Sequence, residues 1–347
     1  MERGSTVSGG PDQFARLVSY GIDDDALLDR LTAGLAEVER AIVDAVRSAD
    51  PLAAVTGSHL VRAGGKRTRP LLCLLAAELG TPGPQVVDAA VVVELTHLAT
   101  LYHDDVIDSA DQRRGVPTAQ QVWGNTVAIL TGDLLFARAS TIGAGLGPEA
   151  VHLQARTFER LVLGEMRETV GPAAADDPVE HYLGVLSDKT GSLIATSARF
   201  GGMFSGADEA TLDLLGGFGE KVGVAFQLAD DVLDLLSDEV DSGKTPGTDL
   251  REHVPTMPVL LLRRDVAAGT APAGSTELLE LLDGDLSADA VLADAVTRLR
   301  AHPVTQQARE VARRWADDAV AALAPLPERS GTRALAAVAQ ALADRTG

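Results

Sequence analysis

The chain has 347 residues, 46% of them apolar and 3% aromatic, and its 50 acidic and 30 basic side chains give a formal net charge of −20. This balance excludes a general nucleic-acid binder and a polybasic membrane anchor, because both need a cationic surface. The single cysteine, Cys73, excludes an internal disulfide framework and a thiolate zinc site. The composition is that of a globular protein, for which we expect a cytoplasmic location.

Apolar residues recur every three or four positions along most of the chain, which is the period of an amphipathic helix. The first such segment runs from Leu27 to Val46. Others follow at 84–103, 126–142, 150–170, 179–200, 210–236, 259–263, 286–301, 304–323 and 331–344. Alternation of period two is missing, and no uninterrupted apolar run approaches the roughly 18 residues of a membrane span. The pattern predicts one all-α domain over residues 13–347, after a disordered segment at 1–12.

The pattern D-D-x-x-D occurs twice, and its members are Asp104, Asp105, Asp108, Asp230, Asp231 and Asp234. Each copy ends a strongly apolar helical stretch, and its first and fifth positions share one helix face. Carboxylates late in a helix meet the negative end of its dipole, so a cation should compensate them. Hard oxygen ligands without His or Cys suit Mg²⁺. The ordinary alternative is a solvated acidic helix end, and the second copy weighs against it.

Basic residues stand close to both aspartate patterns in the sequence. The segment Gly64 to Pro70 reads GGKRTRP and begins a helix, Arg113 and Arg114 follow the first pattern, and Lys244 follows the second. A further basic segment, Lys189-Thr190-Gly191, lies in a predicted helix, so three of the four lysines (Lys66, Lys189 and Lys244) belong to such segments. Lysine and arginine side chains that lie together can bind phosphate, although any one of them alone could be a surface charge. For Arg67 we expect the surface charge.

The chain resembles the trans-isoprenyl diphosphate synthases, the polyprenyl synthetase family, from about Asp25 to its C-terminus. The motifs occur in the family's order: GGKRTRP at 64–70, HLATLYHDDVID at 97–108, RRG at 113–115, GDLLFARA at 132–139, KT at 189–190, QLADDVLD at 227–234 and GKTPGTDL at 243–250. The resemblance implies a bundle of long helices around one central cavity, the isoprenoid synthase fold, in a homodimer.

The same resemblance assigns roles by position. The six aspartates would hold Mg²⁺, about three ions with substrate bound. Contacts to the allylic diphosphate would come from Arg113, Lys189, Thr190, Gln227 and Lys244, with Lys189 and Lys244 acting catalytically on the leaving group. Contacts to the diphosphate of isopentenyl diphosphate would come from Gly65, Lys66, Arg69, His97 and Arg114.

The implied reaction is a metal-assisted ionisation of the allylic diphosphate. The double bond of isopentenyl diphosphate then attacks the allylic cation, and the released diphosphate takes the proton. This scheme needs no dedicated protein base, in keeping with a sequence that shows no Ser-His-Asp constellation.

Ala99 and Thr100 occupy the positions that help to set product length in this family. Thr100 lies one helical turn before Asp104, and short-chain synthases commonly carry an aromatic residue here. Small side chains favour a long polyprenyl product of the menaquinone side-chain type, with at most peripheral membrane contact for its release.

Several alternatives remain at this stage. One alternative is a short-chain synthase that makes farnesyl or geranylgeranyl diphosphate. A class I terpene cyclase would replace the second aspartate pattern, and a non-catalytic partner subunit usually lacks one of the two. A ferritin-like di-iron bundle needs Glu-x-x-His pairs, and neither Glu180-His181 nor Glu252-His253 has that spacing.

Overall fold

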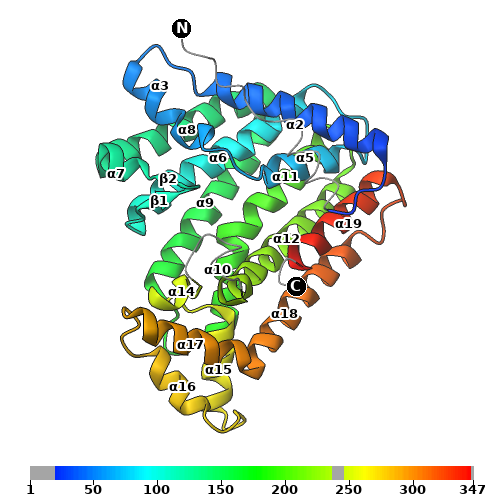
Figure 1. The fold of residues 1–347 in the computed structure, drawn as a ribbon. Helices are drawn as coiled ribbons and strands as arrows, with labels where there is room; N and C mark the ends of the chain where they lie inside the picture. Colours follow the sequence, from blue (N-terminus) through cyan, green and yellow to red (C-terminus); the bar gives the residue numbers. More distant parts are fainter. Residues whose placement is uncertain (1–19, 237–245, 345–347) are drawn as a thin grey trace. The chain divides into compact units, whose positions relative to one another are not determined.

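The computed structural model describes residues 20–236 and 246–344, which fold almost entirely as helices and confirm the predicted all-α class (Figure 1). The chain divides into two compact units, residues 1–160, 192–219 and 322–338 in the first and the remainder in the second. The single domain over 13–347 stays a prediction, and the segment at 1–12 lies outside the described residues.

The first unit is built around one long apolar helix, α6 (Gln85–Ile107). It packs against four neighbouring helices of the same unit, α2 (Asp25–Ala45), α5 (Thr68–Ala77), α8 (Asn125–Leu146) and α11 (Ser192–Met203). Thirteen of its residues are buried, on all sides of the helix. A helix that is apolar all round belongs in a core, and α6 is the core helix here.

Shorter elements complete the first unit. These are α3 (Pro51–Gly57), α4 (His59–Arg62), the strands β1 (Gln112–Arg113) and β2 (Val116–Pro117), α7 (Ala119–Trp123) and most of α19 (Ser330–Ala343). The start of α9 (Pro148–Val170) and the start of α12 (Glu209–Leu236) also belong to it, and both helices end in the second unit.

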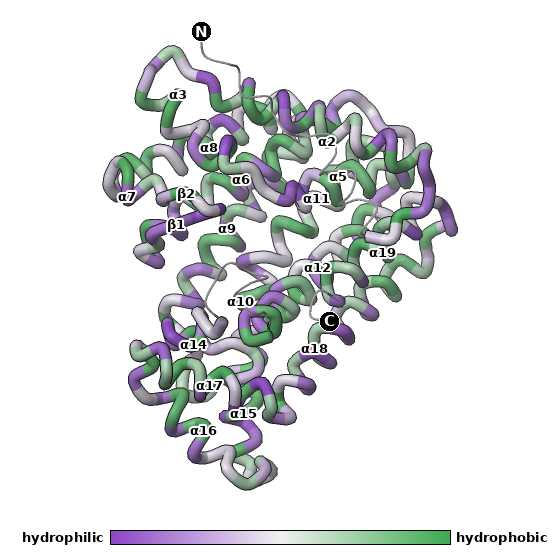
Figure 2. Tube along the Cα trace, viewed as in Figure 1, coloured by the Kyte–Doolittle hydropathy of each residue, from purple (hydrophilic) through white to green (hydrophobic). Residues whose placement is uncertain are grey.

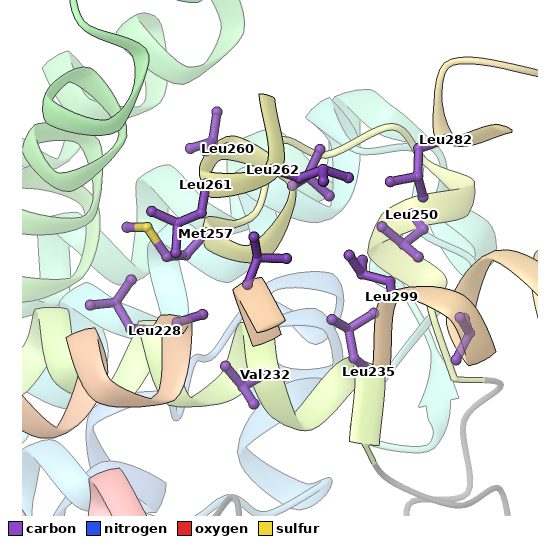
Figure 3. Packing of buried hydrophobic residues seen from close by; sticks show 14 of the residues in the cluster. Leu228, Val232, Leu235, Leu250, Met257, Leu260, Leu261, Leu262, Leu282 and Leu299 are labelled. Carbon is purple, nitrogen blue, oxygen red and sulfur yellow. The ribbon is translucent and has the colours of Figure 1, made fainter. Parts of the chain in front are cut away.

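The second unit has its own hydrophobic core. Leu228, Val232 and Leu235 of α12 pack with Met257 and Leu261 (Figure 3). Met257 begins α15 (Met257–Ala267). The remaining helices of this unit are α10 (Pro178–Leu186), α14 (Thr248–Arg251), α16 (Ser275–Leu282), α17 (Asp289–Ala301) and α18 (Pro303–Ala322), the last of these ending in the first unit. Hydrophobic and hydrophilic segments alternate along the helices of both units, as the periodicity predicts (Figure 2).

Two local features differ from the helical expectation. The helix predicted over 179–200 is interrupted by a π-helical turn, η1 (Ser187–Gly191), which separates α10 from α11. Turns of this kind are rare and are frequently found at functional sites. The strands β1 and β2 form an antiparallel hairpin in which Gln112 pairs with Pro117 and Arg113 with Val116.

Two helices, α6 and α8, are long and apolar enough to cross a membrane by length and composition. Core helices of soluble proteins meet the same two criteria. In the most apolar window of α6, 67% of the residues are buried within the protein, whereas in α8 the share is 33%. The core position of α6 explains its apolar composition.

Candidate active site

The glycine-rich loop between α4 and α5 adopts a backbone that few other residues allow. Gly64 has φ of +81° and Gly65 has φ of +150°, both in the region that favours glycine. Lys66 follows them as an exposed residue. A Cβ atom on Gly65 would lie 2.9 Å from Cζ of Arg114, so the loop backbone and this guanidinium are in close contact.

Arg67 is not the surface charge that we expected from the sequence. Its side chain is 3% exposed, and it forms ion pairs with Glu39 of α2 at 2.7 Å and with Glu94 of α6 at 2.7 Å. The two carboxylates are far from Arg67 in the sequence, which is why the sequence gives no sign of them. Arg67 also has φ of +50° and caps α5, so these ion pairs fix the loop to the core.

Beside Arg67, the predicted diphosphate ligands form a cationic cluster. Burial lowers the pKa of Arg69 to about 10, with Glu94 opposing this change and Arg114 adding to it. The pKa of His97 falls well below its usual range through burial and through the neighbouring arginines, so the imidazole is neutral. Nε of Arg69 is buried and has no hydrogen-bond partner among the residues that the structure describes. An unpartnered guanidinium nitrogen in a cationic cluster is a donor available to an anion.

The hairpin of β1 and β2 positions the backbone of Arg113 and Arg114, the two arginines of the RRG motif. Arg114 and Gly115 form its turn with φ of +55° and +76°, as a type I′ turn requires. Nη1 of Arg114 donates to the carbonyl oxygens of Leu60, at 3.1 Å, and of Gly64. Nε of Arg113 donates to Oδ1 of Asp105 at 2.7 Å. This hairpin could not be predicted from the sequence, because each strand has only two residues.

The first aspartate pattern occupies the last turn of α6. The helix ends at Ile107 with Ser109 at φ of +52°, and the amide of Ala110 donates to the Asp105 carbonyl, as in a Schellman motif. Asp105 is fully buried, and burial raises its carboxyl pKa against the opposing effect of Arg113. Asp104 and Asp108 lie nearer the surface. Asp104 is also close enough to Arg69 to act on its charge, which places this pattern beside the cationic cluster.

A divalent metal fits this first pattern. Among the described residues, Oδ2 of Asp105 is buried and has no hydrogen-bond partner, and the Asp108 carboxylate is close enough to raise the pKa of Asp105. Hard oxygen donors of this kind suit Mg²⁺. Across residues 20–236 and 246–344, no three His, Cys, Asp or Glu side chains are drawn together as finished metal ligands.

The second aspartate pattern lies in the last two turns of α12. Asp231 is buried, and its Oδ2 accepts hydrogen bonds from the Tyr182 hydroxyl at 2.7 Å and from the Met257 amide at 3.1 Å. Burial raises the pKa of Asp231 to about 8. Asp230 and Asp234 are more exposed. Both patterns therefore bury their second aspartate in contacts with the protein and leave the first and fifth near the surface.

The predicted contacts from η1 are partly brought together with those from α12. The Thr190 hydroxyl donates to Oε1 of Gln227 at 3.4 Å. Lys189 lies on the same turn and forms ion pairs with Glu165 and with Glu168 of α9. Lys244, the remaining predicted ligand, lies outside the described residues.

The two residues assigned to product length lie on α6 below the first pattern. Ala99 is fully buried, and a Cβ atom on Gly132 of α8 would lie 3.0 Å from its carbonyl oxygen. Thr100 is partly exposed, and its hydroxyl donates to the His97 carbonyl at 2.8 Å. Neither side chain is bulky, and their role in product length stays a prediction.

The polyprenyl synthetase family model matches residues 51–298, which include both aspartate patterns and every basic motif. The chain belongs to the polyprenyl synthetase family. It is therefore a prenyltransferase, as the resemblance predicted.

A nonaprenyl diphosphate synthase of Mycobacterium tuberculosis is 46% identical over 335 residues, 95% of this chain and 98% of that one. A geranylgeranyl pyrophosphate synthase of Corynebacterium glutamicum, solved with calcium and isoprenyl diphosphate, aligns with a TM-score of 0.82 at 41% identity over 94% of this chain and 99% of that one. A decaprenyl diphosphate synthase of Rhodobacter capsulatus aligns with a TM-score of 0.81 at 34% identity over 93% and 99%.

Sequence reasoning missed several residues that hold the predicted ligands in place. The Tyr182 hydroxyl donates to Asp231, and Glu165 and Glu168 pair with Lys189. Glu94 pairs with Arg67, which is not a predicted ligand but follows Lys66 in the glycine-rich loop. The spacing of Glu165 and Glu168 places both on one helix face and is a signal that was available. The sequence carries no comparable signal for their partner Lys189, because it lies on a different element, η1.

Proposed function

We propose that the chain condenses isopentenyl diphosphate with an allylic diphosphate to make a long-chain trans-polyprenyl diphosphate. The observation that carries this proposal is the cationic cluster beside the first aspartate pattern, with a buried Nε of Arg69 that has no partner. A reaction between two diphosphates needs a cationic site for one diphosphate in addition to a metal-carboxylate site for the other.

We assign the diphosphate of isopentenyl diphosphate to the cationic cluster. Arg69 and Arg114 offer charge-assisted hydrogen bonds, Lys66 offers a point charge, and the loop at Gly65 lets the anion approach the backbone. His97 is neutral, because burial and the arginines lower its pKa. A neutral imidazole adds a hydrogen bond without a further charge.

We assign Mg²⁺ to the aspartates, with Asp104, Asp105 and Asp108 in the first unit and Asp230, Asp231 and Asp234 in the second. The unpartnered Oδ2 of Asp105 supports this assignment. Bound Mg²⁺ would supply charge that stabilises the departing diphosphate. The structures of two relatives that carry calcium and isoprenyl diphosphate are in keeping with a divalent ion.

The chain's own residues would bind and orient the allylic diphosphate. Five residues would donate to its oxygens and stabilise the charge that develops as the carbon–oxygen bond breaks. They are Arg113, Lys189, Thr190, Gln227 and Lys244. Arg113 would donate to the diphosphate while its Nε keeps the hydrogen bond to Asp105. No protein base is assigned, since the released diphosphate can take the proton.

A long product is favoured by the small side chains Ala99 and Thr100 below Asp104. The relative at 46% identity is a nonaprenyl diphosphate synthase, whereas the Corynebacterium relative is named for a geranylgeranyl product. If Thr100 helps to limit the tail, Thr100→Phe should shorten the product by several isoprene units. An unchanged length in the variant would refute that role.

We further propose a homodimer that pairs through α8 in the cytoplasm. Leu130 and Ile129 of this apolar helix are 60% and 42% exposed, and burying them on a second copy would release water from that surface. Sedimentation should give twice the mass of one chain, and a single-chain mass would contradict the dimer. Membrane contact, if it occurs, would be peripheral and limited to product release.

Incubation with Mg²⁺, radiolabelled isopentenyl diphosphate and allylic starters of several lengths tests the proposed function. We expect label in long polyprenyl diphosphates and none when Mg²⁺ is removed by a chelator. Products that stop at geranylgeranyl length would favour the short-chain alternative. Lack of condensation with every starter would overturn the proposal.

A further inference from the structure

The ammonium group of Lys189 is held between two carboxylates of one helix. Nζ lies 2.8 Å from Oε2 of Glu165 and also forms an ion pair with Oε2 of Glu168. The two glutamates are three positions apart on α9, so both face η1. Burial would lower the pKa of Lys189, but the carboxylates outweigh it and raise this pKa above its ordinary value.

Within the part of the chain that the structure describes, the two carboxylates leave one N–H donor of Lys189 without a partner. A lysine ammonium carries three N–H donors, and the two carboxylates take two of them. The side chain is 27% exposed, so the third donor can reach a ligand. Two fixed N–H directions also fix the third, because the ammonium group is tetrahedral.

The backbone that carries Lys189 is fixed separately, by close packing. A Cβ atom on Gly164 of α9 would lie 2.9 Å from the Lys189 amide nitrogen, and one on Gly223 of α12 would lie 2.5 Å from Cα of Gly191. The Ser187 hydroxyl donates to Glu220 of α12. The glutamates are therefore not needed to hold η1, and their contacts act on the end of the lysine side chain.

We propose that Glu165 and Glu168 are positioning residues that aim the third N–H of Lys189 at the allylic diphosphate. This inference rests on the proposed function, in which Lys189 stabilises that leaving group. A flexible lysine loses rotational freedom when it binds an oxygen that gains charge only as the bond breaks. The glutamates remove that freedom beforehand, so their effect belongs in turnover and not in substrate affinity.

A second ion pair between the same two elements provides a matched control. Arg167 of α9 pairs with Asp188 of η1, whereas the ion pairs of Lys189 are with Glu165 and Glu168. Asp188→Asn therefore removes one charge from the same junction by the same acid-to-amide change as Glu165→Gln and Glu168→Gln.

The test compares steady-state kinetics of Glu165→Gln, Glu168→Gln and Asp188→Asn, with circular dichroism to check the fold. We expect kcat to fall about tenfold in each glutamine variant while both KM values stay within about twofold, and Asp188→Asn to match the wild type. In a Lys189→Ala background, Glu168→Gln should have no further effect on kcat, because the glutamate acts through the lysine.

Three results would overturn the inference. One is an unchanged kcat with a lower KM for the allylic diphosphate, which would mean that the glutamates only screen the lysine charge. Another is an equal loss in Asp188→Asn, and the third is an additive loss in the Lys189→Ala background. In each of these three cases the wild-type protein still condenses its substrates. If the wild-type protein did not condense them, the proposed function would be overturned as well.

Discussion

Arg67 and Arg69 lie two residues apart at the start of α5 and have opposite surroundings. Arg67 faces Glu39 and Glu94, and these ion pairs raise its pKa above the ordinary value although burial opposes this. Arg69 has a buried Nε that finds no partner in the described parts of the chain, and burial lowers its pKa. The first arginine therefore stabilises the fold, and the second is available to a ligand.

Gly65→Ala tests the contact between the loop and Arg114. The added methyl would lie 2.9 Å from Cζ of Arg114 and displace the guanidinium. We expect KM for isopentenyl diphosphate to rise about tenfold, the cost of weakening one hydrogen bond to a charged group. Steady-state kinetics with the allylic substrate at saturation would measure it.

Gly64→Ala is the matched control. Gly64 also has positive φ, but a Cβ atom there would meet nothing within 4 Å. This variant should lose about 1 kcal/mol of stability to backbone strain and keep the wild-type KM. If Gly64→Ala raised KM as much as Gly65→Ala, loop strain and not Arg114 would explain both.

Arg67→Met tests the buried ion pairs. The change leaves Glu94, whose side chain is 2% exposed, without its ion-pair partner. We expect a loss of about 3–5 kcal/mol in the free energy of unfolding, measured in urea. Arg30→Met removes the more exposed pair with Glu78 and should cost at most about 1 kcal/mol. Similar losses in the two variants would mean that Arg67 is not a structural ion pair.

At the scale of elements, α6 joins the core to the site. Its apolar surface packs on four helices, while its last turn carries the first aspartate pattern. Close approach to α8 occurs at Gly132, where a Cβ atom would lie 2.6 Å from Cδ2 of His103 and 3.0 Å from the Ala99 carbonyl. Because His103 directly precedes Asp104, the close contact between α6 and α8 also fixes the position of the first aspartate pattern.

Gly132→Ala should separate α6 from α8 at this crossing. We expect a loss of about 1–3 kcal/mol in stability, with lower turnover because the Asp104 carboxylate moves. Gly145→Ala on the same helix meets nothing within 4 Å and should instead gain about 0.5–1 kcal/mol. Thermal unfolding of both variants compares them, and a gain for Gly132→Ala would contradict the close crossing.

Helix periodicity predicted most elements because most helices are long and bury one face. The predicted segment 210–236 corresponds closely to α12, and 84–103 to most of α6. The turn η1 was missed because it has only five residues, too few to interrupt the helical pattern of the segments on either side. The hairpin at Arg114 was missed because two-residue strands have no detectable alternation.

At the scale of the whole molecule, a net charge of −20 is compatible with anionic substrates. Cationic side chains at defined positions can make the local electrostatic potential positive in a protein of negative net charge. Burial and four nearby arginines lower the pKa of His97. These arginines are Arg67, Arg69, Arg113 and Arg114. The motifs predicted where these charges stand in the sequence. Their partners could not be predicted, since Glu39 and Glu94 approach Arg67 only in the folded chain.

Replacing one aspartate in each pattern tests the central claim most directly. Asp104→Ala and Asp230→Ala should each lower turnover at least about a hundredfold in the radiolabelled condensation assay, because each removes a metal-binding carboxylate. Circular dichroism should show unchanged helix content, since both side chains lie near the surface. Turnover near the wild-type level in either variant would contradict the assignment of the aspartates to a metal-diphosphate site.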